Sequence, residues 1–197
     1  MLHHIRQYKL EQGALEVQYI EECFAEFKNK KKTASEIMKR LANREHLILI
    51  SMAKSDDGED GYPVAFKVGH ELRARESDPK LVELVDQLSD SVDLSNGKVF
   101  YSWIGATREP WRGQGHYRAL TEQQEEWAHL HGYRLIIVKT KNKFYPMRAA
   151  LDHLRFDVIK FQSDPLDNGE SKMFLAKEIG SHLLRSHLTT RSVTEHV

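Results

Sequence analysis

The chain has 197 residues, 29 of them basic and 29 acidic, so its formal net charge is zero and its sequence pI is about 7.2. This length predicts one domain, and the balanced charge excludes an overall field that would attract nucleic acid or an anionic membrane. The single cysteine, Cys23, excludes an internal disulfide and a multi-cysteine zinc site, and no apolar run approaches the roughly 20 residues that span a bilayer. We therefore expect a soluble, cytoplasmic protein.

The first half of the chain mixes helical and strand patterns. Apolar residues recur at helical spacing around Ile20–Phe24, and Thr33-Ala34-Ser35-Glu36 has the form of a capping box before a second helix. The apolar run Leu47–Ala53 predicts a buried strand, and Tyr62–Leu72 predicts a strand that pairs back with it. Asp78-Pro79 predicts the start of a third helix, because an aspartate cap precedes a first-turn proline.

The second half continues this alternation. Helical patterns run from about Tyr117 to Gly132 and over Met147–Leu154. Short apolar or alternating runs predict four further strands, at Val99–Thr107, Tyr133–Lys139, Phe156–Phe161 and Lys172–Lys177. This order predicts an α/β chain with a mixed sheet. We expect one domain over residues 1–178, followed by a weakly patterned C-terminal tail, 179–197.

A glycine-bearing turn, Arg112-Gly113-Gln114-Gly115-His116-Tyr117, joins a predicted strand to a predicted helix. Glycine permits positive φ and close backbone approach, and a helix N-terminus attracts anions. The turn lacks the three glycines of the dinucleotide fingerprint and the Gly-Lys-Ser/Thr ending of the Walker A loop. It predicts a phosphate-binding loop of another kind, with an ordinary strand-to-helix connection as the alternative.

Four residues of this region, Arg112, Gly115, Ala119 and Leu120, resemble the pyrophosphate-binding pattern of the GCN5-related N-acetyltransferase (GNAT) family. The order of elements over residues 3–177 is also similar to that family's acyl-CoA N-acyltransferase fold, a central splayed mixed sheet flanked by helices. The resemblance implies acetyl-CoA as cosubstrate, with no metal. It further implies acetyl transfer to a primary amine of a small molecule or peptide, by direct attack in a ternary complex.

The resemblance also implies which residues hold the cosubstrate. Backbone groups at the end of the predicted strand Val99–Thr107 would pair with the pantetheine arm and polarise the thioester carbonyl. The N–H groups of the turn and the Arg112 side chain would hold the pyrophosphate. The asparagine would hydrogen-bond the pantetheine arm. The cofactor-binding set is Gly105, Ala106, Thr107, Arg112, Gly113, Gln114, Gly115, His116, Tyr117 and Asn142.

In many family members a tyrosine protonates the departing thiolate, but the corresponding position here is Leu151, and Arg155 stands where the family has a glycine. Tyr145 is the nearest phenol and is our candidate for the general acid. Packing or capping at a helix start is the alternative role of this tyrosine.

The amine must lose a proton during attack, which requires a base. Glu71 is our candidate base, with His70 a weaker one, and Tyr101 is a candidate for the base or its water relay. A solvated carboxylate at a strand end is the alternative reading of Glu71.

Two other functions remain open. Tyr117, a bulky residue where the family has glycine or alanine, and Leu151 motivate a catalytically impaired acyl-CoA-binding module with the same fold. The basic run Lys28–Lys32 motivates nucleic-acid binding, although a solvated loop explains it better. We expect no nucleic acid and no membrane among the partners, and a homodimer remains open.

Overall fold

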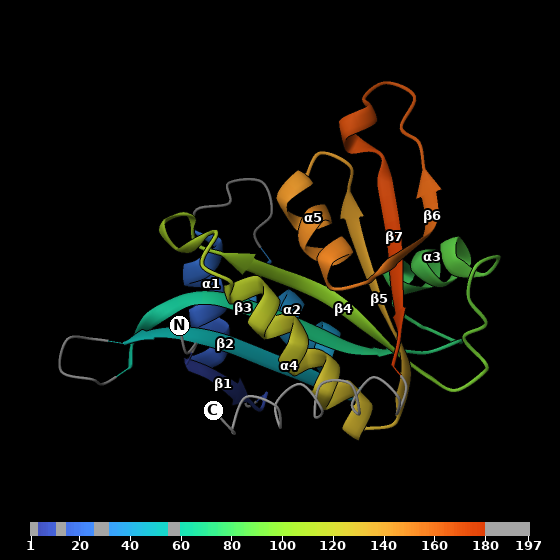
Figure 1. Ribbon diagram of the computed structural model, residues 1–197. Helices are drawn as coiled ribbons and strands as arrows, with labels where there is room; N and C mark the ends of the chain where they lie inside the picture. Colours follow the sequence, from blue (N-terminus) through green and yellow to red (C-terminus); the bar gives the residue numbers. More distant parts are fainter. Residues whose placement is uncertain (1–3, 11–14, 26–31, 55–59, 180–197) are drawn as a thin grey trace, which may run out of the picture.

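The computed structural model describes residues 4–10, 15–25, 32–54 and 60–179 (Figure 1). These form a seven-stranded sheet in the order β1-β2-β3-β4-β5-β7-β6. The strands are β1 (His4–Tyr8), β2 (His46–Lys54), β3 (Asp60–Leu72), β4 (Lys98–Thr107), β5 (Tyr133–Lys141), β6 (Asp157–Gln162) and β7 (Lys172–Glu178). The helices are α1 (Leu15–Phe24), α2 (Ala34–Leu41), α3 (Pro79–Leu88), α4 (His116–Leu130) and α5 (Tyr145–His153), with short 3₁₀ turns η1 (Glu109–Trp111) and η2 (Asn168–Glu170).

Local sequence signals set the helix starts as expected. Thr33 accepts a hydrogen bond from the Glu36 N–H, and the Glu36 carboxylate accepts one from the Thr33 N–H, which completes the predicted capping box before α2. Asp78 caps α3 by accepting from the Lys80 N–H at 2.9 Å, with Pro79 in the first turn. The predicted strands and helices of the described residues are all present.

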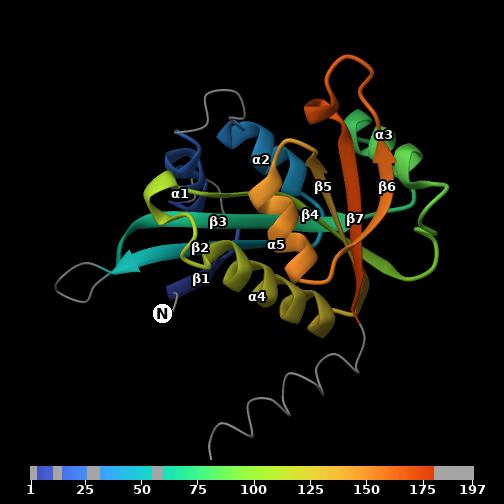
Figure 2. The same ribbon diagram turned by 45° about the horizontal axis from the view of Figure 1, so that its top comes forward.

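The helices form a layer on each face of the sheet. Helices α4 and α5 lie in front of it in Figures 1 and 2, and α1, α2 and α3 lie behind it in Figure 1. Each layer buries its own apolar cluster. Leu120 and Leu151 pack on the front face, while Ile20, Ile37 and Leu84 pack on the back face.

The sheet is mixed because its two halves are joined by one parallel pair. Strands β1 to β4 pair in antiparallel order, β4 pairs with β5 in parallel, and β7 lies between β5 and β6 with both neighbours antiparallel. No described helix combines the length and apolarity needed to cross a membrane. Most of the basic run 28–32 and nearly all of the tail, 180–197, lie outside the described residues.

A candidate active site where two strands separate

Strand β4 contains a bulge at the centre of the sheet. His70 of β3 pairs with Tyr101 and Val68 pairs with Ile104, so the single residue Gly69 faces two residues of β4. A bulge bends its strand, increases its twist and leaves a backbone group unpaired. The bend therefore falls in the middle of β4.

Strands β4 and β5 separate at this bulge. Their parallel pairing begins at Lys98 and Tyr133 and ends at Ser102 and Val138. Beyond that pair, β4 remains joined only to β3, and β5 only to β7. Figure 1 shows the two strands running together and then diverging, with α4 beside one and α5 beside the other. The diverging part of β4 contains Gly105, Ala106 and Thr107, whose backbone edge toward β5 pairs with no strand in the described sheet.

The glycine-bearing turn follows the diverging end of β4. Gly113 and Gly115 have φ of 75° and 84°, so both occupy the left-handed region that favours glycine. Arg112 Nε donates to the Thr107 carbonyl at 3.1 Å, and the Gln114 side chain donates to the Pro110 carbonyl at 3.1 Å. These bonds tie the turn to the strand end.

Gly115 is the N-cap of α4, and no side chain caps it. The Ala119 N–H donates a hydrogen bond to the Gly115 carbonyl at 3.0 Å. The N–H groups of the preceding residues therefore lie at the positive end of the helix dipole, where helices bind phosphate and other anions.

The side chains of His116 and Tyr117 point away from this turn. His116 is 5% exposed, with Nδ1 3.0 Å from Ser51 Oγ of β2. The Tyr117 ring packs against the front core, with the Lys67 ammonium 4.2 Å from its centroid. Only the backbones of these two residues are available to a ligand at the turn, and the Tyr117 ring lies on the sheet side of α4.

Tyr101 and His70 form an aromatic pair on the back face at the bulge. Their ring centroids are 5.6 Å apart at 80°, and the Trp103 ring lies 5.8 Å from His70. Burial raises the pKa of Tyr101 to about 12, so its phenol keeps its proton at neutral pH.

The His70 imidazole is neutral. Burial lowers its pKa to about 3, against a hydrogen bond to the Glu71 carbonyl that acts in the opposite direction. Nδ1 lies 2.7 Å from that carbonyl, and since a carbonyl oxygen only accepts, Nδ1 carries the hydrogen. Nε2 is then an acceptor, buried and without a hydrogen-bond partner in the described part of the chain.

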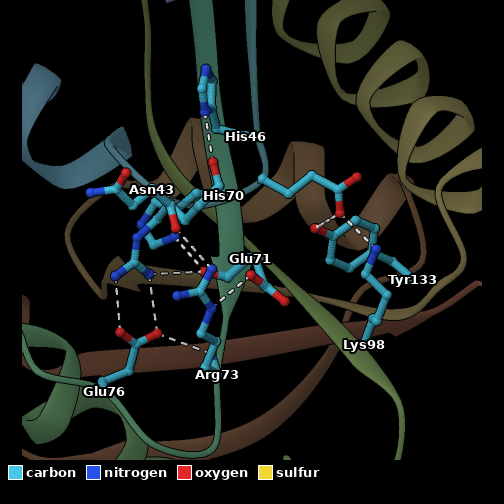
Figure 3. A network of polar contacts seen from close by, with 10 residues as sticks. Asn43, His46, His70, Glu71, Arg73, Glu76, Lys98 and Tyr133 are labelled. Carbon is cyan, nitrogen blue, oxygen red and sulfur yellow. Dashed lines mark hydrogen bonds and ion pairs between the residues drawn. The ribbon is translucent and has the colours of Figure 1, made fainter.

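Glu71 lies on the opposite face from Tyr101. It pairs with Phe100, which belongs to the front cluster, whereas Tyr101 belongs to the back cluster. Figure 3 shows Glu71 and Arg73 at the end of β3, where the Arg73 Nε donates to the Glu71 carboxylate at 2.8 Å. The structure thus brings His70 to Tyr101, and it places Glu71 in an ion pair elsewhere.

A buried arginine, Arg44, binds the end of β3 that contains Glu71. Arg44 pairs in bidentate fashion with Glu76, at 3.1 and 2.9 Å, and donates to the Glu71 carbonyl at 3.1 Å. Beside this network, the Glu45 carboxylate accepts from Tyr133 and Lys98, both at 2.6 Å (Figure 3). These contacts fix the end of β3 that carries His70.

Asn142 follows β5 and links three elements. Its side chain donates to the Asn168 carbonyl of η2 at 3.0 Å, and its Oδ1 accepts from Arg148 of α5 at 2.6 Å. The amide is therefore engaged within the protein, and its role toward a cosubstrate stays a prediction.

Helix α5 carries the remaining candidates. Tyr145 is 65% exposed in the first turn, and Leu151 is fully buried in the front core. Arg155 has φ of 61°, so an arginine adopts the left-handed conformation at the position where the resemblance expects glycine. The role of Tyr145 as acid stays a prediction.

A hollow of about 840 Å³ lies elsewhere, beside the first residues of β5 and the last residues of β7. Its lining contains none of the predicted site residues and mixes basic and acidic groups, among them Arg134, Lys177 and Glu178. Within the described ranges, no group of three or more histidine, cysteine, aspartate or glutamate residues is placed to hold a metal ion.

The chain was compared with known proteins. No protein-family model and no curated protein sequence matches it. Among solved structures it is similar to Arabidopsis thaliana NAA60 in complex with acetyl-CoA, with a TM-score of 0.66 and 16% identity over 89% of this chain and 99% of that one.

Two further structures are similar over a comparable length. A putative acetyltransferase of the GNAT family from Desulfovibrio desulfuricans has a TM-score of 0.59 and 16% identity, over 91% of this chain and 100% of that one. The NatC complex bound to Gag peptide and CoA has a TM-score of 0.61 and 12% identity, over 89% and 99%. At these identities the likeness shows the fold, so the predicted GNAT-like fold is confirmed.

Proposed function

We propose that this chain, which has the GNAT acyl-CoA N-acyltransferase fold, transfers an acetyl group from acetyl-CoA to a primary amine. The observation that carries the proposal is the position of the bulge. It separates β4 from β5 immediately before a glycine turn that leads into the N-terminus of α4. An open strand edge is therefore followed along the chain by a helix N-terminus. The open edge is suited to bind an amide-bearing arm, and the helix N-terminus is suited to bind a diphosphate.

The residues present fit such a ligand. A Cβ on Gly113 would have no heavy atom within 4 Å, so the turn is open on that side. A Cβ on Gly105 would lie 3.1 Å from the Phe66 carbonyl, so this position favours glycine and leaves a bare backbone on the open edge of β4. Acetyl-CoA would supply an activated acetyl thioester there.

In this proposal the backbone of Gly105, Ala106 and Thr107 binds the amide-bearing arm, and a main-chain N–H of this stretch polarises the thioester carbonyl. The turn N–H groups from Gly113 to Tyr117 bind the diphosphate, with Arg112 adding a positive charge. The amine attacks the carbonyl carbon directly, without a covalent enzyme intermediate.

On the acceptor side, Tyr101 and His70 stand at the bulge. Because the Tyr101 phenol is protonated at neutral pH, it serves as a hydrogen-bond donor that orients a water. The adjacent acceptor is Nε2 of His70, which has no hydrogen-bond partner among the described residues. Glu71 is a less suitable base than the sequence suggests, since its carboxylate faces the other layer and is paired with Arg73.

Peptides are the first acceptors to test, because one of the similar structures is bound to a peptide and CoA. Small amines form the second panel. Release of free thiol from acetyl-CoA reports transfer to either class, and mass spectrometry identifies the acetylated amine.

Cosubstrate binding is tested by calorimetric titration and thermal unfolding with acetyl-CoA. Wild-type protein should be stabilised by about 2.7 kcal/mol when acetyl-CoA is at 100 times its Kd. Gly115→Ala should weaken binding by roughly tenfold or more, because the turn N–H groups lose their direction.

The matched control is Gly132→Ala, at the other end of α4, where glycine has a similar φ of 76° and no neighbour within 4 Å of a Cβ. It should bind acetyl-CoA like the wild type. Absence of binding by wild-type protein contradicts the proposal. Binding without transfer to any amine favours the impaired acyl-CoA-binding module instead.

A further inference from the structure

A buried lysine lies beside the open half of β4. Lys67 is in the middle of β3, is 1% exposed, and pairs with Gly105. A Cβ on Gly105 would lie 3.6 Å from Lys67 Cγ, so the lysine stem occupies the space above that glycine on the front face. The stem therefore lies over the stretch to which we assign the acyl-CoA arm.

The Lys67 ammonium lies between the sheet and α4. Its Nζ is 4.2 Å from the centroid of the Tyr117 ring, and Glu125 of the same helix acts on it electrostatically. The Glu125 carboxylate is itself paired with Lys177 of β7 at 2.6 Å, and the His116 ring has Nδ1 3.0 Å from Ser51 Oγ. The cation thus faces an aromatic ring, and the carboxylate that acts on it is already paired.

The adjoining side of α4 carries polar atoms that lack partners. Tyr117 Oη, Glu125 Oε1 and both amide atoms of Gln124 are buried without a hydrogen-bond partner among the residues that the structure describes. Gln124 is 0% exposed. Buried polar groups in native proteins are nearly always hydrogen-bonded, so this side of α4 is suited to a polar occupant.

Burial lowers the pKa of Lys67 to about 7, although the charge of Glu125 opposes that shift. Both protonation states are therefore populated at neutral pH. A general acid acts best when its pKa lies near the operating pH.

We propose that Lys67 is a catalytic residue whose ammonium faces the sulfur of bound coenzyme A and protonates the departing thiolate. This inference rests on the proposed function. The amine nitrogen bonds to the carbonyl carbon, the carbon–sulfur bond breaks, and Lys67 gives its proton to the sulfur. One proton of the amine passes to solvent, from which Lys67 regains its own.

The proposal accounts for the leucine at the expected tyrosine position. Leu151 has no proton to give, and Tyr145 is 65% exposed, whereas Lys67 is buried with its stem over Gly105 of β4. In this arrangement the general acid, Lys67, belongs to β3 and lies on the face of the sheet that α4 covers.

The decisive experiment needs no acceptor. Coenzyme A is bound to the protein, and the ultraviolet absorbance of its thiolate is followed as the pH is raised, with the Kd measured separately by calorimetry. Lys67, with a pKa of about 7, is neutral before the thiol ionises, so the contact is detected with a residue that keeps its charge. In Lys67→Arg, the thiol pKa of bound coenzyme A should lie about one unit or more below that in the wild type, because a permanent cation faces the sulfur. Lys67→Met should bind coenzyme A within about threefold of wild type and show no such shift.

Lys98→Arg is the matched control. Lys98 also lies over a tyrosine ring, with Nζ 4.5 Å from the Tyr133 centroid, but at the opposite end of β4. This variant should leave the thiol pKa at its wild-type value. An unshifted thiol in a Lys67→Arg variant that binds coenzyme A overturns this inference and leaves the proposed function standing. Failure of wild-type protein to bind coenzyme A overturns both.

Lys67→Arg separates proton donation from charge, and it preserves the cation if the methionine variant fails to fold. Arginine stays protonated and gives up no proton, so kcat with an amine acceptor should fall by about 100-fold at unchanged KM although a cation still faces the sulfur. The decline of wild-type kcat above pH 7 should also disappear. Restoration of wild-type kcat by arginine overturns the role in proton donation.

Discussion

Gly69 of β3 lies directly under the ring of Phe100 of β4. A Cβ on Gly69 would be 2.3 Å from Phe100 Cε1 and 2.8 Å from the Tyr101 carbonyl, distances that no side chain tolerates. Because Gly69 is the residue opposite the bulge, this contact keeps β4 bent at the point where it leaves β5.

We predict that Gly69→Ala destabilises the protein by about 1–3 kcal/mol, because the added methyl group overpacks the junction. Acetyl-CoA affinity should fall as well, since the bend that opens the strands must shift. Chemical denaturation and titration measure the two effects. Phe100→Leu serves as the second arm of a double-mutant cycle, and the cost of Gly69→Ala should be smaller in its background. Strict additivity of the two substitutions would contradict this reading.

His70 should make stability depend on pH. Its pKa is about 3 in the folded protein, against an ordinary value of 6.5, so the unfolded chain binds the proton more readily. The stabilising contribution is complete above pH 6.5 and is lost as the pH falls toward 3, at up to about 1.4 kcal/mol per pH unit. We expect His70→Gln to flatten the free energy of unfolding over this interval. Equal slopes for His70→Gln and wild type would refute the assignment.

Arg155 should be replaceable with a gain in stability. Its φ of 61° places it in the left-handed region, and the Arg155 and Phe156 N–H groups bond to the Asp152 and Leu151 carbonyls in a Schellman arrangement that ends α5. Glycine relieves about 1–2 kcal/mol of backbone strain at such a position. We therefore predict that Arg155→Gly raises Tm. Asn43→Gly, at φ of 60°, should give a smaller gain, because asparagine tolerates this conformation better.

Asn142 and Arg148 should be energetically coupled. Arg148 donates to the Asn142 side chain at 2.6 Å, and the same amide holds η2. A double-mutant cycle of Asn142→Ala and Arg148→Ala should give a coupling energy of about 1–2 kcal/mol in unfolding experiments. If Asn142 also binds the cosubstrate, Arg148→Ala should leave acetyl-CoA affinity intact while Asn142→Ala lowers it. Equal loss of affinity in both variants indicates that the asparagine acts only through the fold.

Much of this architecture was predictable from local pattern. The capping box at Thr33, the Asp78-Pro79 helix start and the glycine turn at 113–115 are short-range signals, and each forms as expected. The face on which a strand residue lies was harder to predict, because it depends on the register between neighbouring strands. Glu71 pairs with Phe100 and His70 pairs with Tyr101, so Glu71 and Tyr101 fall on opposite faces although the sequence suggested a shared site.

Lys67 was missed although a signal was present. It is the lone lysine or arginine in the predicted strand Tyr62–Leu72 and interrupts the apolar run 63–68, and a lysine in a buried strand is rare unless it is paired or functional. What the sequence could not provide was the distance from Lys67 to Tyr117, which depends on how α4 crosses the sheet. Such contacts between elements distant in the chain have no local signature.

The insertion of β7 between β5 and β6 has a consequence for synthesis of the protein. One wall of the separation between β4 and β5 is paired only with the strand Lys172–Glu178, so it has no partner on that side until those residues have left the ribosome. A nascent chain that ends before them presents an unpaired β5 edge, which is prone to join other chains. Acetyl-CoA should thus bind only after residue 178 has left the ribosome. Shorter, stalled chains should aggregate whether or not acetyl-CoA is present.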